Sequence, residues 1–253
     1  MIKKLLSSIG IGAAKVDTQL EKVTFNPGEE IKGIVMITGG NVEQQIDEIY
    51  ITLMTSYIRE KDDRQVRETV ILEKYKLNNP FEITPNGRQD LPFQFTLPTD
   101  IPITKGKTKI WLQTGLDIKN AVDPKDNDYI EIKPHPLVQS FLDAVREIGF
   151  ITREVECKTA PRAMRKTYPF IQEFEFVPTT GIFSGRLDEL EAIFSVDNNQ
   201  VEAFLQIDRK ARGLGSLLSE ALNMDESYAS FRFGHEDIPE LNRKLTTLIN
   251  KYC

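Results

Sequence analysis

Hydrophobic and polar residues alternate along most of residues 16–133, and this period of two predicts β-strands. In the stretch KIWLQTGLDIK (109–119), Ile110, Leu112, Leu116 and Ile118 would share one face of a strand. Similar stretches with turn signals between them occur at 25–37, 44–58, 66–77 and 127–133. Because no helical pattern separates these stretches, they favour an antiparallel β-sandwich over parallel βαβ units.

The stretch QDLPFQFTLPTDIP (89–102) combines this alternation with prolines. Leu91, Phe93, Phe95 and Leu97 would point to one side of a strand. Proline donates no hydrogen bond to a sheet, so Pro92 and its neighbours restrict this strand to a short length or an open edge. We expect it to place Phe93 and Phe95 in the core, where each contributes roughly 1.5–3 kcal/mol.

A helical period first interrupts the strands at residues 136–148. Leu137, Phe141, Leu142 and Val145 form one stripe, and Gly149 is the expected stop. Strand patterns then resume at 150–158, 170–178, 187–196, 200–210 and 227–233, with a hairpin turn at 197–200. Short helices are predicted at 216–222 and 238–252.

These patterns predict a mainly β protein with two tandem antiparallel β-sandwich domains. The first would cover residues 1–134, and the second, with a linker helix and a C-terminal helix, residues 135–253. A third helix is expected at the N-terminus, where Ile2, Leu5, Leu6 and Ile9 would form one apolar face. Three hypotheses apply to this helix: docking on the protein's own surface, contact with a membrane surface or partner, or a cleaved signal sequence.

Composition narrows the classes of function. The 253 residues carry a formal net charge of −6, which disfavours nucleic acid as a partner. The two cysteines, Cys157 and Cys253, form no C-x-x-C motif, so we expect a reducing cytoplasm and no thiolate metal site. No run of 18 apolar residues is present to span a membrane.

No motif points to catalysis, and we expect no enzyme, cofactor or metal. The histidines, His135 and His235, lack a nucleophile elbow and are interpreted as surface residues. The stretch DPKDND (123–128) lacks the glycine and distal glutamate of an EF-hand and is interpreted as a solvated turn. Glu189 and Glu191 fit the wet face of a strand.

Two basic clusters are candidate partner-binding residues, together with the N-terminal apolar face. Their ordinary interpretation is a solvated surface, and the functional one is docking of an acidic or phosphorylated partner. The clusters are Arg162, Arg165 and Lys166, and Arg209, Lys210 and Arg212.

Several segments carry a resemblance to known families. The Pro-Gly turn in TFNPGEEIKGIVMI, the later LPFQFTLPTDIP and the long strand TKIWLQTGLDIK resemble the N-terminal half of the arrestin fold. The segments SIGIGAAKVDT, GRLDELEAIFSV and QIDRKARGLGSLLSEALNMDES resemble the bacterial sporulation-control family SpoOM. This resemblance implies arrestin-like sandwiches and an intracellular regulator of early sporulation that binds other proteins without catalysis.

Three function classes therefore stand open. The first is a non-catalytic cytoplasmic regulator with a protein partner. The second is an adaptor held at a membrane surface by the N-terminal helix. The third is a β-sandwich that binds a small ligand or carbohydrate, or an unrecognised hydrolase. Edge strands of a sandwich can also pair with a second copy, so a homodimer is a further hypothesis.

Overall fold

The computed structural model describes residues 13–61, 64–77, 80–118, 123–197, 200–209 and 226–252. The chain forms two compact units. Unit 1 comprises residues 1–57, 67–104 and 108–133, and unit 2 comprises residues 58–66, 105–107 and 134–253. Two short segments of the first half of the chain, residues 58–66 and 105–107, thus belong to unit 2.

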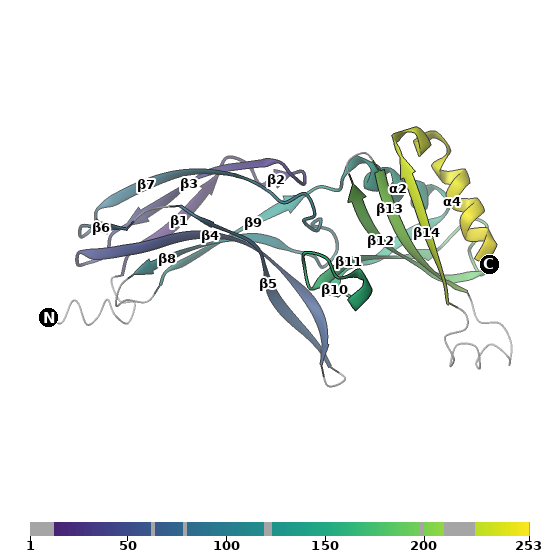
Figure 1. The fold of residues 1–253 in the computed structure, drawn as a ribbon, viewed down its shortest axis with the longest axis horizontal. Coiled ribbons are helices and arrows are strands. Elements are labelled where there is room, and N and C mark those ends of the chain that lie inside the picture. Colours follow the sequence, from purple (N-terminus) through teal and green to yellow (C-terminus); the bar gives the residue numbers. More distant parts are fainter. Residues whose placement is uncertain are drawn as a thin grey trace. The chain divides into compact units, whose positions relative to one another are not determined.

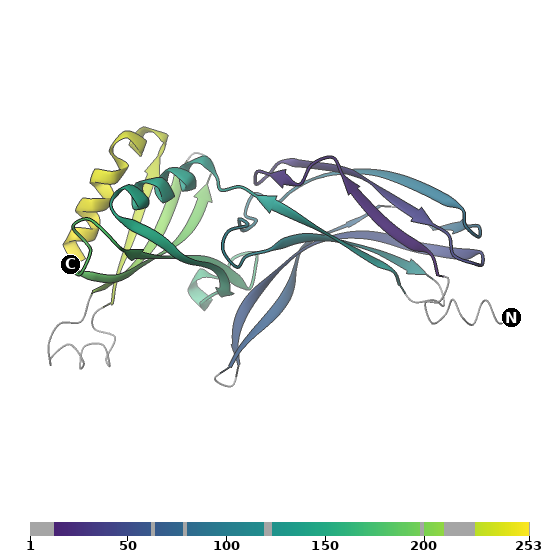
Figure 2. The same cartoon turned by 180° about the vertical axis from the view of Figure 1, so that it is seen from behind.

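Unit 1 is a sandwich of two sheets, as Figures 1 and 2 show. The smaller sheet has the order β1-β3-β7, with β1 at Lys15–Leu20, β3 at Glu30–Thr38 and β7 at Arg88–Thr96. The larger sheet has β4 (Gln44–Lys61), β8 (Ile110–Ile118), β9 (Lys125–Ile132) and β2 (Thr24–Phe25) in that order. Strands β5 (Arg64–Lys76) and β6 (Phe81–Ile83) both pair with β4.

The predicted alternation is confirmed in the core of unit 1. Strands β8 and β4 are antiparallel, with Leu53 opposite Leu112 and Ile49 opposite Leu116, and all four side chains are buried. Because alternate residues of a strand face opposite sides, each strand buries one face against the facing sheet. The apolar alternation therefore positions both layers.

Strand β7 shows how the fold accommodates prolines. It is the edge strand of its sheet and pairs with β3, with Pro92 opposite Ile34. The strand runs over nine residues, longer than the segment 91–97 expected from the sequence. An edge strand needs only half of its N–H groups for pairing, so a proline whose nitrogen faces the open edge costs no ladder hydrogen bond.

Unit 2 has one antiparallel sheet in the part of the chain described. Its order is β10 (Phe150–Thr159), β11 (Phe170–Pro178), β12 (Leu187–Asp197), β13 (Gln200–Arg209) and β14 (Glu226–Gly234). The hairpin expected at 197–200 is confirmed, since Asp197 pairs with Gln200.

Two α-helices lie on one face of this sheet: α2 (Pro136–Glu147) and α4 (Leu241–Ile249) (Figures 1 and 2). The ring of Phe141 on α2 packs edge-on against Phe194 of β12, with centroids 4.9 Å apart, and stacks on Phe233 of β14 at 5.9 Å. The mainly β, sandwich-like fold class is confirmed. The structure adds that helices form the layer facing the sheet of unit 2.

The C-terminal helix starts later than its sequence pattern suggests. A 3₁₀ helix η2 (His235–Glu240) precedes α4, and Asp237 accepts a hydrogen bond from the Gly234 N–H at 2.8 Å. Asp237 therefore caps η2 and not the start of α4. Pro239 lies inside η2 and favours a separate short turn before the regular helix. The helices expected at the N-terminus and at 216–222 lie outside the described residues.

Candidate functional site

The structure places one predicted basic cluster on the surface of unit 2. Arg162 lies in the 3₁₀ helix η1 (Arg162–Met164), Arg165 directly follows it, and both are exposed. Lys166 is also exposed, and its Nζ donates to Ser195 Oγ at 2.7 Å. This short segment gathers three cations beside the end of β12.

The second basic cluster is only partly described. Arg209 is exposed at the last position of β13, opposite Leu187. Lys210, Arg212 and the apolar face of Ile2, Leu5, Leu6 and Ile9 lie outside the described residues. Their predicted roles stay predictions.

An acidic surface that the sequence pattern did not predict covers the face of the unit 2 sheet that points away from α2. Register places Glu154 opposite Glu175, Glu156 opposite Glu173, and Glu175 opposite Glu191. Since side chains on paired positions point the same way, these carboxylates lie side by side on one face of the sheet. We call this surface, formed by Glu154, Glu156, Glu173, Glu175 and Glu191, the acidic sheet face.

Three cations compensate part of this charge. Arg153 bridges the carboxylates of Glu175 and Glu189. Lys158 pairs with Glu173, and Lys107 pairs with Glu154 at 2.6 Å. Arg153 reaches the face because β10 has a register irregularity between Thr152 and Glu154. A bulge of this kind redirects a side chain that strict alternation would place elsewhere.

Glu191 is the exception on this face. In the part of the chain that the structure describes, its carboxylate makes no ion pair with the three cations. Burial and the neighbouring Glu173 raise the pKa of Glu191 to about 7. The wet face predicted for Glu189 and Glu191 is therefore only partly solvated, because adjoining strands crowd acids around one position.

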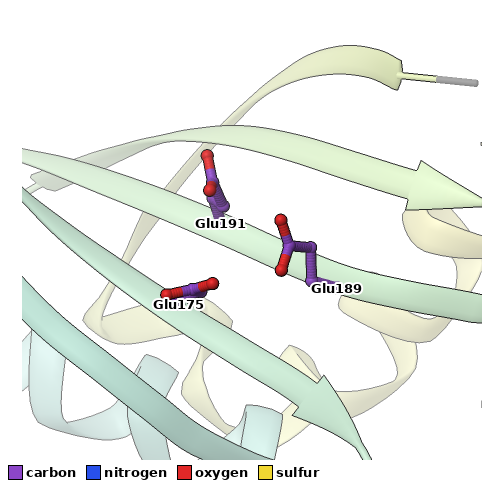
Figure 3. A group of neighbouring side chains, drawn as sticks. All are labelled: Glu175, Glu189 and Glu191. Atoms are coloured by element: carbon purple, nitrogen blue, oxygen red, sulfur yellow. The ribbon is translucent and has the colours of Figure 1, made fainter. Parts of the chain in front are cut away.

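Figure 3 shows the three carboxylates that lie closest to a metal-binding arrangement, those of Glu175, Glu189 and Glu191. Each offers an oxygen within 4.8 Å of the others. Carboxylate oxygens suit hard cations such as Mg²⁺ and Ca²⁺. The Arg153 guanidinium pairs with the carboxylates of Glu175 and Glu189. These three residues form an ion-pair network, and Glu191 lies beside it.

The solvated turn predicted for residues 123–128 is wrong for its last part. Residues 125–132 form β9, and Asp126 accepts a hydrogen bond from the Thr18 N–H at 2.7 Å. Asp128 Oδ2 is buried. This polar stretch is therefore part of strand β9, and the side chains of Asp126 and Asp128 face the other sheet.

The histidine interpretation also changes. His135 is the N-cap of α2, and its Nδ1 accepts the Leu137 N–H at 3.3 Å. Burial, and to a lesser degree His235, lower the pKa of His135. His135 therefore has a structural role at the start of a helix, whereas His235 lies exposed at the start of η2.

Two open hollows in the described part of unit 1 bear on the small-ligand hypothesis. The larger, about 540 Å³, lies beside β9 and is lined by Val23, Tyr129 and neighbouring residues. The smaller, about 290 Å³, lies beside Asp17 and Arg88. Neither hollow gathers the charged residues singled out above.

None of the helices in the described part of the chain is both long enough and apolar enough to cross a membrane.

Comparisons with known proteins agree in family. Residues 2–211 match the family model described as SpoOM protein. The sporulation-control protein spo0M of Bacillus subtilis (strain 168) is 42% identical over 254 residues, covering 99% of this chain and 98% of that protein. The crystal structure of Spo0M from Bacillus subtilis superposes with a TM-score of 0.84 at 38% identity, covering 96% of this chain and 100% of the other. The SpoOM resemblance drawn from the sequence is confirmed, and the chain belongs to the SpoOM family.

Proposed function

We propose that this protein is a non-catalytic cytoplasmic regulator of early sporulation that acts by binding another protein. The observation that carries the proposal is the match to a sporulation-control protein over 99% of the chain, with both lengths covered almost completely. A match of this extent includes both units, so the regulatory role transfers to the whole chain.

The surface chemistry of unit 2 supports binding. Arg162 and Arg165 are exposed on a short, proline-preceded segment and make no ion pair among the described residues. Guanidinium groups form paired hydrogen bonds with carboxylates and phosphates, and an unoccupied pair of them suits an acidic partner. We assign the protein contact to Arg162 and Arg165, with Lys166 beside them.

The test uses the full chain in its native cells. Deletion of the gene is expected to change the yield of heat-resistant spores after starvation, and the wild-type gene on its own promoter is expected to restore it. An unchanged spore yield in the deletion strain would refute the regulatory role.

Partner binding is tested separately by crosslinking and affinity purification at the onset of starvation. Arg162→Gln with Arg165→Gln is expected to lower partner recovery about tenfold, since two exposed charge pairs contribute up to about 1 kcal/mol each. The matched control replaces two exposed arginines elsewhere in unit 2, Arg146→Gln with Arg243→Gln, and should retain the partner. Equal recovery by both double variants would reject the assigned surface.

A further inference from the structure

Two aspartates of β9 face the interior of the unit 1 sandwich near one end. Asp126 lies opposite Thr114 of β8, and Asp128 lies opposite Leu112. Both β8 residues are fully buried. Side chains two positions apart on a strand share a face, so the two carboxyl groups are neighbours on the inner side.

Asp126 holds an edge strand of the other sheet. Strand β1 pairs with β3, which leaves its second edge directed toward β9. The Thr18 N–H of β1 donates to Asp126 Oδ2 at 2.7 Å, and the Thr18 and Thr114 hydroxyl groups are 2.7 Å apart in a buried hydrogen bond. A carboxylate from β9 thus satisfies a backbone donor that the β1-β3 ladder does not use.

Asp128 sits beside this contact with unfavourable surroundings for a negative charge. Its Oδ2 is buried and has no hydrogen-bond partner among the described residues. The charged groups that act on it are acids, Asp126 on its own strand and Asp17 on β1, while the facing β8 residues Leu112 and Thr114 are uncharged. Burial, followed by Asp126, raises the pKa of Asp128 to about 6.

We propose that Asp128 carries a proton beside the hydrogen bond between Asp126 and Thr18, and that loss of this proton weakens the attachment of β1 to β9. With the proton on Asp128, its buried carboxyl group is uncharged, and Asp126 accepts the Thr18 N–H. When Asp128 ionises, two neighbouring carboxylates repel each other and a charge is left on a buried oxygen. Rotation of the Asp126 side chain toward water relieves this repulsion and removes the acceptor for the Thr18 N–H.

The sign of the effect follows from the direction of the shift. The pKa of Asp128 is raised above its ordinary value of 3.8, so its stabilising contribution is complete below pH 3.8 and is lost as pH rises through about 6. Strand β1 should therefore be held more firmly in mildly acidic solution than at pH 7.5. This inference concerns a pH-sensitive device in unit 1 and does not depend on the function proposed above.

The test is hydrogen exchange of the full chain at pH 5.0, 6.0 and 7.5, corrected for intrinsic exchange rates and read for peptides covering β1 and β3. We expect the protection of β1 to fall several-fold between pH 5.0 and 7.5, with a midpoint near pH 6. Asp128→Asn should keep β1 protected across this range. The control Asp117→Asn, an exposed position on neighbouring β8, should retain the wild-type pH dependence.

Two outcomes would overturn the proposal: equal protection of wild-type β1 at all three pH values, or a pH dependence unchanged in Asp128→Asn. Saturable binding of Ca²⁺ or Mg²⁺ that restores β1 protection at pH 7.5 would instead make the pair a cation site and also overturn it. A carboxyl ¹³C NMR titration of the wild-type chain keeps the proposal testable if the variant fails to fold. Titration of Asp128 near pH 6 supports the proposed proton on Asp128, and titration below pH 4.5 refutes it.

Discussion

The ring of Tyr75 stacks on that of Phe95, with centroids 3.8 Å apart and an angle of 15° between the planes. Tyr75 lies on β5, which pairs with β4 of the larger sheet, and Phe95 lies on β7 of the smaller one. The Tyr75 hydroxyl donates to the Thr96 carbonyl oxygen at 3.1 Å. The contact therefore joins the two layers of unit 1 along the open edge of β7.

Tyr75→Ala should destabilise unit 1 by about 1–3 kcal/mol, because it removes an aromatic stack and leaves space over a half-buried phenylalanine. Urea unfolding of the full chain, followed by a probe in unit 1, measures the change. Tyr75→Phe separates the contributions, since it keeps the stack and loses only the hydrogen bond, at about 1 kcal/mol. An Ala variant as stable as the Phe variant would contradict a structural role of the stack.

The hydrophobic pattern predicted the strands and α2 well, because each of these elements follows from the periodicity of apolar residues within its own segment. The strand expected at 170–178 coincides with β11, and the helix pattern at 136–148 yields α2 with its glycine stop. In these segments the buried face and the local backbone preference agree, so tertiary contacts change little.

The charged sites depend on contacts between distant segments, and pattern could not reveal them. Asp126 accepts a hydrogen bond from the Thr18 N–H, 108 positions away in the sequence, and no local pattern in DPKDND indicates this contact. The acidic sheet face requires the register of β11 against β12, and Arg153 joins it only through the irregularity in β10. The sequence signal for this acidic face is the alternation of glutamates in two predicted strands, residues 170–178 and 187–196.

Gly149 ends α2 in a conformation that other residues adopt at a cost. Its φ is +104°, and an added Cβ would lie 2.3 Å from the Thr180 carbonyl oxygen. Gly149→Ala should therefore destabilise unit 2 by about 2 kcal/mol or more, combining backbone strain with a clash against backbone atoms. Thermal unfolding provides the measurement.

Gly115→Ala is the matched control for this prediction. Gly115 lies in β8, and an added Cβ would meet no atom within 4 Å. Its melting temperature should stay close to that of the wild type. Similar destabilisation by both alanines would show that the position-specific argument for Gly149 is wrong.

Glu191 should make unit 2 less stable as the solution becomes alkaline. Its pKa is raised from 4.5 to about 7, so the stabilisation is complete below pH 4.5 and is lost as pH rises through 7. Glu191→Gln should raise the melting temperature of unit 2 at pH 8 and leave it nearly unchanged at pH 4.5. Asp188→Asn, at an exposed position on the same strand, should change neither value. A Gln variant that melts with the wild type at pH 8 would argue against a destabilising charge at Glu191.

His135 should act in the opposite direction on the same unit. Its pKa is lowered from the ordinary 6.5, because burial disfavours the imidazolium and His235 adds a smaller repulsion. The neutral ring also caps α2, since a protonated Nδ1 could no longer accept the Leu137 N–H. Above pH 6.5 the lowered pKa of His135 costs no folding stability, because this histidine is neutral in both the folded and the unfolded chain. As pH falls below 6.5 the unfolded chain binds the proton first, so folding loses stability until the folded pKa is passed.

His135→Asn tests this expectation, because asparagine is a good N-cap and does not titrate in this range. At pH 7.5 the variant should melt near the wild type, and between pH 6.5 and 5 it should lose less stability than the wild type does. The measurement is the melting temperature in the Glu191→Gln background, which removes the opposing titration of the acidic sheet face. His235→Asn is the control, and its pH profile should stay close to that of the parent, because His235 contributes only the smaller repulsion. Parallel profiles of His135→Asn and its parent would mean that the imidazole cap does not couple the stability of α2 to pH.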